Sequence, residues 1–114
     1  MAVNLTRLTN SFATAPQIQP ADLPEIAALG FKTVINARPD GEEGAAQPTS
    51  AAIEAAAKAA GLDYAHIPVV PGQITPAHAQ QFADLMQKHP GPVFAFCRSG
   101  ARAVSLYQLA SAAH

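Results

Sequence analysis

Hydrophobic and polar positions along this chain follow two patterns, and each pattern predicts one kind of element. Short runs rich in β-branched and aromatic residues indicate strands, and longer alanine-rich segments indicate helices. The predicted strands are Phe31–Ala37, Tyr64–Val69 and Val93–Phe96, with one or two short strands near a sheet edge between Asn4 and Ala15. The predicted helices are Ala21–Leu29, Ser50–Ala60, Pro76–His89 and a segment that begins at Ala101.

The ends of the predicted helices carry residues that commonly start or stop a helix. Gly30 and Gly61 follow the first two helices, and glycine is the usual residue just past a helix C-terminus. Ser50 is expected to cap the second helix and Thr75 the third. Pro76 then occupies the first helical position, where the missing N–H has no intrahelical partner to lose.

The order of elements from residue 31 onward is strand, helix, strand, helix, strand, helix. Helices of this length between successive strands imply parallel pairing with right-handed crossovers. Such crossovers place helices on both faces of the sheet. The sequence therefore predicts a three-layer α/β fold with a mainly parallel central sheet flanked by helices.

The composition fits one globular domain over residues 1–114, with 49% hydrophobic and 13% charged residues. A formal net charge of -1 gives no reason to expect nucleic acid or a membrane surface as a partner. The N-terminus lacks a signal-peptide pattern, and the single cysteine, Cys97, cannot form an internal disulfide, so we expect a cytoplasmic protein. Because the chain stops one helix after Cys97, the domain could also have been cut from a longer protein.

Cys97 ends the last predicted strand and is followed by a short loop and a helix. The carboxyl ends of parallel strands carry the chemistry of α/β folds, and the first turn of a helix stabilises anions, including a thiolate. Gly100 allows the loop amides to turn inward, and Arg102 offers a fork of N–H donors to an oxyanion. We therefore interpret Cys97 as a nucleophilic thiolate that faces solvent, because a structural cysteine is rarely flanked by two arginines. The predicted substrate-binding residues of its loop are Arg98, Ser99, Gly100 and Ala101.

Five segments together resemble the phosphatase-like domain of bacterial beta-lactamase-hydrolase-like proteins. They are Gln17-Ile18, Phe31–Asn36, Arg38–Glu42, His66–Val69 and Phe96–Arg102, within a similarity from about Leu5 to Leu109. The resemblance implies a small relative of the protein tyrosine and dual-specificity phosphatase fold. It also implies a domain that occurs alone or fused to a persulfide dioxygenase or a flavin-dependent sulfide-oxidising enzyme. Members are labelled both phosphatase and sulfurtransferase, so the resemblance leaves the chemistry open.

Three features favour sulfur transfer over phosphate hydrolysis. Four residues separate Cys97 from Arg102, one fewer than in protein tyrosine phosphatases, and a tighter ring of amides fits a smaller group, as in single-domain rhodaneses. The segment Val70–Thr75 has no acid, although a phosphatase usually protonates its leaving group with an aspartate from this region. Ala103 replaces the hydroxyl residue that commonly follows the arginine in phosphatases.

The main sequence-based hypothesis is therefore a rhodanese-like sulfurtransferase. The Cys97 thiolate takes sulfane sulfur from thiosulfate or glutathione persulfide, holds it as a persulfide, and passes it to a thiol acceptor. Arg102 binds the anionic end of the donor, and Arg98 recruits anions at the mouth of the site. One alternative is a tyrosine or dual-specificity type phosphatase that forms a Cys97 phosphoenzyme. The other is a persulfide carrier or sensor without turnover, serving a fused or associated enzyme.

Asp40 is the third candidate catalytic residue, because it lies in the resembling segment and follows a neighbouring strand. It is expected either to donate a proton or to brace Arg98 or Arg102, with a solvated turn as the equal alternative. Glu42 and Glu43 are interpreted as solvated residues of an acidic turn.

Arg38 is expected to pair with Asp40 or with substrate, and the structural pairing is favoured. Tyr107 is interpreted as a packing residue, and His66 as a hydrogen-bonded residue at the core. The histidines show no ligand spacing and have no cysteine partner, so neither a metal nor a cofactor is expected. They are His66, His78, His89 and His114.

Overall fold

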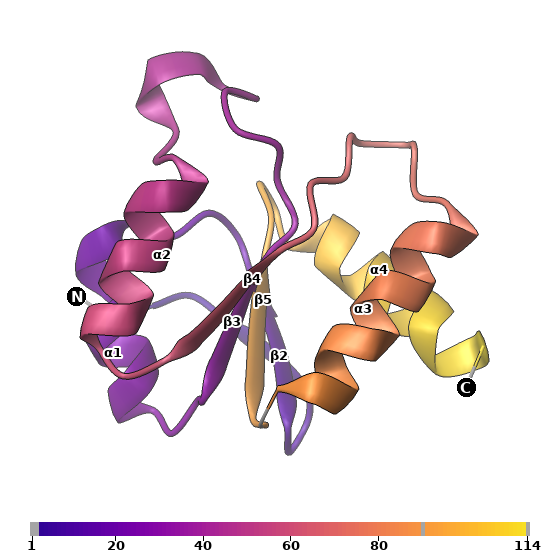
Figure 1. Ribbon diagram of the computed structural model, residues 1–114, viewed down its shortest axis with the longest axis horizontal. Coiled ribbons are helices and arrows are strands. Elements are labelled where there is room, and N and C mark those ends of the chain that lie inside the picture. Colours follow the sequence, from indigo (N-terminus) through magenta and orange to yellow (C-terminus); the bar gives the residue numbers. More distant parts are fainter. Residues whose placement is uncertain (1–2, 90, 114) are drawn as a thin grey trace.

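A computed structural model describes residues 3–89 and 91–113. It contains a five-stranded sheet with the strand order β1-β2-β5-β3-β4 (Figure 1). The strands are β1 (Thr6–Thr9), β2 (Phe12–Ala15), β3 (Thr33–Asn36), β4 (Asp63–His66) and β5 (Val93–Phe96). β1 pairs with β2 in antiparallel orientation, whereas β2 with β5, β5 with β3, and β3 with β4 pair in parallel. The predicted mainly parallel sheet is confirmed.

Helices cover both faces of this sheet (Figure 1). On one face lie α1 (Leu23–Ala28) and α2 (Ser50–Ala59), and on the other lie α3 (Pro76–Lys88) and α4 (Ala101–Ala113). Two short 3-10 turns, Pro20–Asp22 and Gly44–Ala46, precede α1 and α2. The predicted three-layer α/β architecture is confirmed. Within the described residues, no helix has both the length and the hydrophobicity to cross a membrane.

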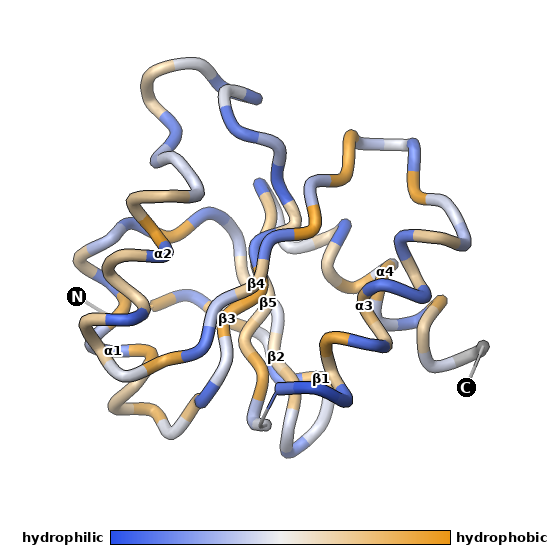
Figure 2. Tube along the Cα trace, in the orientation of Figure 1, coloured by the Kyte–Doolittle hydropathy of each residue, from blue (hydrophilic) through white to orange (hydrophobic). Residues whose placement is uncertain are grey.

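The core is divided into two layers by the sheet, because successive residues of a strand point to opposite faces. Ile35 packs with Phe82 and Leu106 on the α3 and α4 side, and Val34 packs with Ile53 on the α2 side. All five side chains are fully buried, and burial of each contributes about 1.5–3 kcal/mol to folding. Figure 2 shows the hydrophobic residues along the central strands, with hydrophilic residues prominent in the loops above them.

Of the element ends that differ from the sequence-based prediction, two have a clear local reason. Thr49 caps α2 in place of Ser50: its hydroxyl accepts a hydrogen bond from the Ala52 N–H at 3.1 Å. The hydroxyl of Ser50 instead lies 2.7 Å from the Tyr64 hydroxyl. β4 ends at His66, before the predicted end, because Pro68 has no N–H for the sheet.

The carboxyl ends of the four parallel strands meet at one edge of the sheet, the upper edge in Figure 1. Backbone hydrogen bonds join the segments that follow these strands. Ala37 N–H donates to Phe96 O at 2.9 Å, and Val69 N–H donates to Ala37 O at 3.1 Å. Four loops distant in sequence are thereby brought together around Cys97.

Candidate active site

Cys97 follows β5, which is the middle strand of the sheet. Its backbone N–H donates to Ala15 O at 3.3 Å, and its Sγ accepts a hydrogen bond from the Gly100 N–H at 3.0 Å. A hydrogen bond from a loop amide favours the anionic form of a cysteine. The residue is only 1% exposed, so the prediction that its sulfur faces solvent is wrong. The loop folds back over the sulfur and directs the Gly100 amide at it.

Gly100 makes this closed loop possible. Its φ of +94° lies in a region that side-chain-bearing residues rarely adopt. The adjoining amide of Ala101 donates to the Ser99 hydroxyl at 3.4 Å, and the Gly100 carbonyl accepts the Val104 N–H at 3.1 Å, in the first turn of α4. The predicted loop residues therefore form one hydrogen-bonded turn beside the sulfur.

Arg102 is held against this turn by Glu42, which comes from the loop after β3. Its Nη1 and Nη2 donate to the two carboxylate oxygens of Glu42, each at 2.7 Å, and Nη1 also donates to Val69 O at 2.8 Å. The hydrogen bond to Glu42 raises the pKa of Arg102, and the charge of Cys97 acts in the same direction. In return, the hydrogen bond from Arg102 lowers the pKa of Glu42. Both groups are charged in this arrangement.

The geometry leaves one edge of the Arg102 guanidinium directed away from Glu42. A guanidinium carries five N–H groups, and the contacts with Glu42 and Val69 use three of them. The two others, on Nε and Nη2, form the second edge of the planar fork, and the guanidinium also interacts with the side chain of Cys97. An edge of this kind matches two oxygens of a phosphate, sulfonate or carboxylate.

A pocket of about 420 Å³ opens beside Arg102. One wall is formed by the segment between β4 and α3, and the other by the cysteine loop and the start of α4. Its lining residues are Pro71, Gly72, Ile74, Arg98, Ser99, Ala101, Arg102 and Ser105. None of these described lining residues is acidic, as the sequence of residues 70–75 indicates.

Glu42 is not the solvated residue that the sequence suggested, whereas Glu43 is exposed as predicted but also forms an ion pair. The side chain of Glu42 is 16% exposed and contacts Arg38 as well as Arg102, and Glu43 bonds to Arg38. Glu43 also lies 3.5 Å from Nε of Arg98, which is exposed at the mouth of the pocket. The acidic turn is therefore part of the site. The sequence feature that could have identified this turn as part of the site is its position directly after β3, the parallel strand next to β5.

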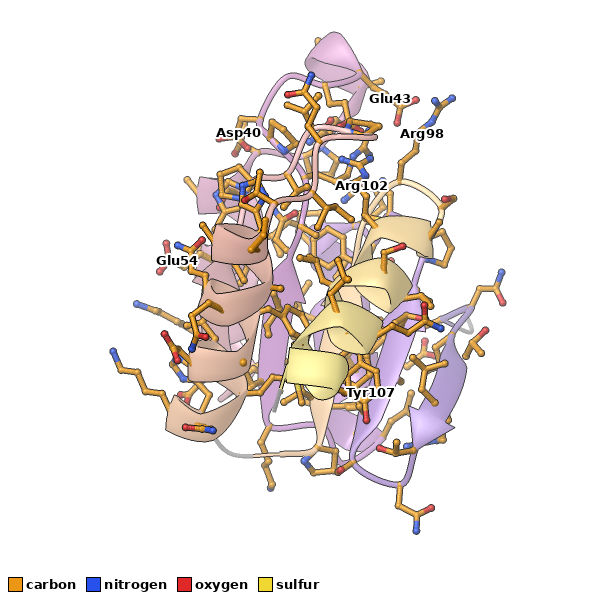
Figure 3. The ribbon with its side chains drawn as sticks, turned by 90° about the vertical axis from the view of Figure 1, so that its right-hand side faces the viewer. Asp40, Glu43, Glu54, Arg98, Arg102 and Tyr107 are labelled. Carbon is orange, nitrogen blue, oxygen red and sulfur yellow. The ribbon has the colours of Figure 1, made fainter. Side chains whose placement is uncertain are left out.

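Asp40 lies away from Arg98 and Arg102 in Figure 3. Its carboxylate accepts a hydrogen bond from the Ser50 N–H at 2.7 Å, at the start of α2. Glu42 therefore braces Arg102 in place of Asp40. Arg38 pairs with the two glutamates rather than with Asp40, and its favoured structural role agrees with a side chain that is fully buried.

The described histidines take part in local contacts. Nε2 of His66 contacts the Arg38 carbonyl, His78 pairs with Thr75 at the start of α3, and His89 lies 3.3 Å from the Asp63 carboxylate. His114 lies outside the described residues. Among the described side chains, no group of three or more potential ligands is gathered as a metal ion would require. Tyr107 stacks on Phe12, with ring centroids 4.3 Å apart.

Comparison with known sequences identifies one family over nearly the whole chain. The model of the phosphatase-like domain of beta-lactamase hydrolase-like protein matches residues 4–114. A beta-lactamase hydrolase-like protein of Agrobacterium fabrum is 46% identical over 106 residues, which cover 93% of this chain and 24% of that protein. A beta-lactamase hydrolase-like protein of Xylella fastidiosa is 36% identical over 107 residues, which cover 94% of this chain and 25% of that protein. The chain spans about a quarter of the length of these curated relatives.

Solved structures share the fold. A phosphatase-like protein from Neisseria meningitidis is 35% identical, with a TM-score of 0.81 over 89% of this chain and 71% of that one. Tk-PTP, solved in its active form, matches at 15% identity and a TM-score of 0.67, over 94% of this chain and 80% of that one, which shows the fold alone. The fold, the cysteine loop and the sequence matches establish that the chain belongs to the family of phosphatase-like domains of beta-lactamase hydrolase-like proteins.

Proposed function

We propose that this domain is a cysteine-dependent phosphatase that acts on phosphate monoesters. The observation that carries the proposal is the pairing of Cys97 Sγ with the Gly100 amide beside a charged, immobilised Arg102, on a phosphatase-like fold. TpbA of Pseudomonas aeruginosa, which matches this chain at a TM-score of 0.61 and 17% identity, is solved in complex with pTyr. We therefore place aryl phosphates among the substrates to be tested.

In the first step, the Cys97 thiolate attacks phosphorus. A sulfur–phosphorus bond forms while the ester oxygen–phosphorus bond breaks, and the leaving oxygen takes a proton from water. The Nε and Nη2 edge of Arg102 binds two phosphoryl oxygens, and Arg98 attracts the dianion to the pocket mouth. In the second step, water attacks phosphorus, releases inorganic phosphate and restores the thiolate.

The described pocket lining contains no acid, which has a consequence for substrate choice. Without a protein group to protonate the leaving oxygen, the rate should depend strongly on how acidic the departing alcohol is. Aryl phosphates of acidic phenols should therefore be hydrolysed faster than alkyl phosphates.

A second candidate is sulfur transfer, and two specific observations favour it. Only four residues lie between Cys97 and Arg102, and the closed loop leaves Cys97 1% exposed. A single sulfane sulfur needs less space at the thiolate than a phosphoryl group does. In this reaction Cys97 attacks the outer sulfur of thiosulfate or glutathione persulfide, releasing sulfite or glutathione thiolate, and a thiol acceptor then removes the sulfur. A fused or associated persulfide dioxygenase or sulfide-oxidising flavoprotein would be the matching partner.

One experiment separates these reactions. Wild-type protein and the Cys97→Ser variant are compared for aryl phosphate hydrolysis and for thiocyanate formation from thiosulfate and cyanide. Phosphate release that requires Cys97 supports the phosphatase. Thiocyanate formation without phosphate release refutes it in favour of the sulfurtransferase. A single stoichiometric sulfur transfer, without turnover, would identify a carrier instead.

A further inference from the structure

Arg38 is a buried charged residue that the proposed mechanism does not use. Its side chain is 0% exposed, and each of its three guanidinium nitrogens has a partner. Nη1 donates to Gln17 Oε1 at 2.7 Å, Nε donates to Glu42 Oε2 at 2.9 Å, and Nη2 donates to Glu43 Oε1 at 2.7 Å. The backbone is fixed as well, because the Arg38 N–H donates to Asn36 Oδ1 at 2.9 Å. The Arg38 side chain is therefore held in one position, and its hydrogen bonds hold the carboxylates of Glu42 and Glu43 in place.

Each of these glutamates contacts one arginine of the cysteine loop. Glu42 receives both terminal nitrogens of Arg102 at 2.7 Å. Glu43 lies 3.5 Å from Nε of Arg98, and Figure 3 shows Glu43 and Arg98 beside each other above Arg102. Arg38 is thus connected to the arginine next to the sulfur and to the arginine at the pocket mouth through two adjacent residues of one turn.

The charges of this cluster explain why a buried arginine is useful there. Arg38, Arg98 and Arg102 carry three positive charges, and Glu42 and Glu43 carry two negative charges, so these five side chains have a net charge of +1, which offsets the negative charge of the Cys97 thiolate in the proposed mechanism. Without Arg38, the two carboxylates would neutralise Arg98 and Arg102, and the Cys97 thiolate would leave the site with a net negative charge that repels an anion. Burying a guanidinium costs several kcal/mol, which an apolar side chain of similar size would avoid.

The two connections differ in strength. The Glu42–Arg102 pair is bidentate and largely shielded from water, with side chains 16% and 9% exposed. The Glu43–Arg98 pair is longer and open to solvent, with side chains 43% and 68% exposed, so it contributes little by itself. Any effect of Arg38 on the site should therefore pass mainly through Glu42.

We propose that Arg38 is a positioning residue for anion capture, acting through Glu42 on Arg102 and, to a smaller extent, through Glu43 on Arg98. The inference rests on the role of Arg102 in the proposed function. It adds that Arg38 orients Arg102 and offsets the negative charges of Glu42 and Glu43. This role would be the same for a phosphoryl substrate and for a sulfur-oxyanion substrate.

The test uses two variants that keep the charge of the side chain but cannot form the same set of hydrogen bonds. Arg38→Lys retains one positive charge but cannot reach Gln17, Glu42 and Glu43 together. Glu42→Asp retains the carboxylate but is too short to bridge two arginines. Each should weaken the binding of inorganic phosphate by about tenfold, the loss expected for one hydrogen bond between charged groups. Arg7→Lys and Glu54→Asp make the same changes outside the site and should leave phosphate affinity unchanged.

Binding is measured by NMR titration with inorganic phosphate, after near-UV circular dichroism has shown that each variant is folded. Glu42→Asp alters a partly exposed side chain, so it tests the proposal even where Arg38→Lys fails to fold. In the double variant, the effect of Arg38→Lys should largely disappear, because its path to Arg102 is already broken. Where an aryl phosphate is turned over, kcat and KM should change with these two variants but not with the two controls.

Unchanged phosphate affinity in either folded site variant would overturn the proposal, as would strictly additive effects in the double variant. Absence of phosphate binding by the wild type would also overturn it, because no anion would then be captured. If the wild type binds phosphate in an Arg38-dependent manner yet hydrolyses no ester, the proposed phosphatase function fails while the role of Arg38 stands.

Discussion

At the scale of single residues, the site depends on which N–H groups of the Arg102 guanidinium are used by contacts within the protein. Glu42 and the Val69 carbonyl occupy one side of Arg102, and the Nε and Nη2 edge, which binds substrate in the proposed mechanism, lies outside these contacts. The same contacts keep Glu42 ionised. Glu42, which the sequence pattern assigns to a solvated turn, therefore sets the orientation of the arginine beside Cys97.

The lowered pKa of Glu42 predicts a pH dependence of stability. Its interaction with Arg102 contributes fully above the unfolded-state pKa of about 4.5 and is lost as the pH falls through the lower folded-state value. Glu42→Gln should therefore reduce stability near neutral pH and flatten the acid side of the profile. Denaturant unfolding of both proteins between pH 7 and pH 3 measures this. A constant stability difference down to pH 3 would contradict the assignment.

Asp40 is the second residue whose role can be decided directly. Its carboxylate already accepts the Ser50 N–H at 2.7 Å, and Asn can accept the same hydrogen bond. We expect Asp40→Asn to retain the wild-type rate with an aryl phosphate, to within about twofold, since a general acid normally contributes at least about a hundredfold. A much larger loss, together with a changed pH profile, would restore Asp40 as the proton donor.

At the scale of elements, the site is assembled from the ends of strands rather than within any one element. Gln17, Glu42, Val69 and Cys97 follow β2, β3, β4 and β5, respectively. The strand cores could be predicted because β-branched and aromatic runs are local signals. Their exact ends depended on neighbours: Pro68 shortens β4, and the helix predicted at Ala21–Leu29 is divided into a 3-10 turn and α1.

The start of α2 gives a prediction at this scale. Thr49→Ala removes the hydroxyl that accepts the Ala52 N–H and should cost about 1 kcal/mol of stability. Thr49→Ser keeps an equivalent hydroxyl and should cost much less. Urea unfolding of the two variants makes the comparison. Equal losses in both would show that the methyl group of Thr49, and not its cap, matters.

At the scale of the whole molecule, the two core layers share one sheet, and β2, β3, β4 and β5 each contribute residues to both of them. We propose that residues 1–114 form one domain and should unfold as one cooperative unit. The thermal transition followed by far-UV circular dichroism should then coincide with the transition followed by tyrosine fluorescence. Two separated transitions would contradict a single domain.

The sequence by itself determined the kinds and order of the elements, the parallel sheet and the position of Cys97 before a glycine-containing loop and a helix. Those features are encoded locally, in hydrophobic period, in caps and in the conformational freedom of Gly100. Only the tertiary structure decided that Cys97 is buried, that Glu42 holds Arg102 across 60 residues of sequence, and that Arg38 joins the two glutamates. The physical reason is that strand order places the loop after β3 beside the loop after β5. Long-range contacts, and not residues nearby in the sequence, therefore set the partners of Arg98 and Arg102.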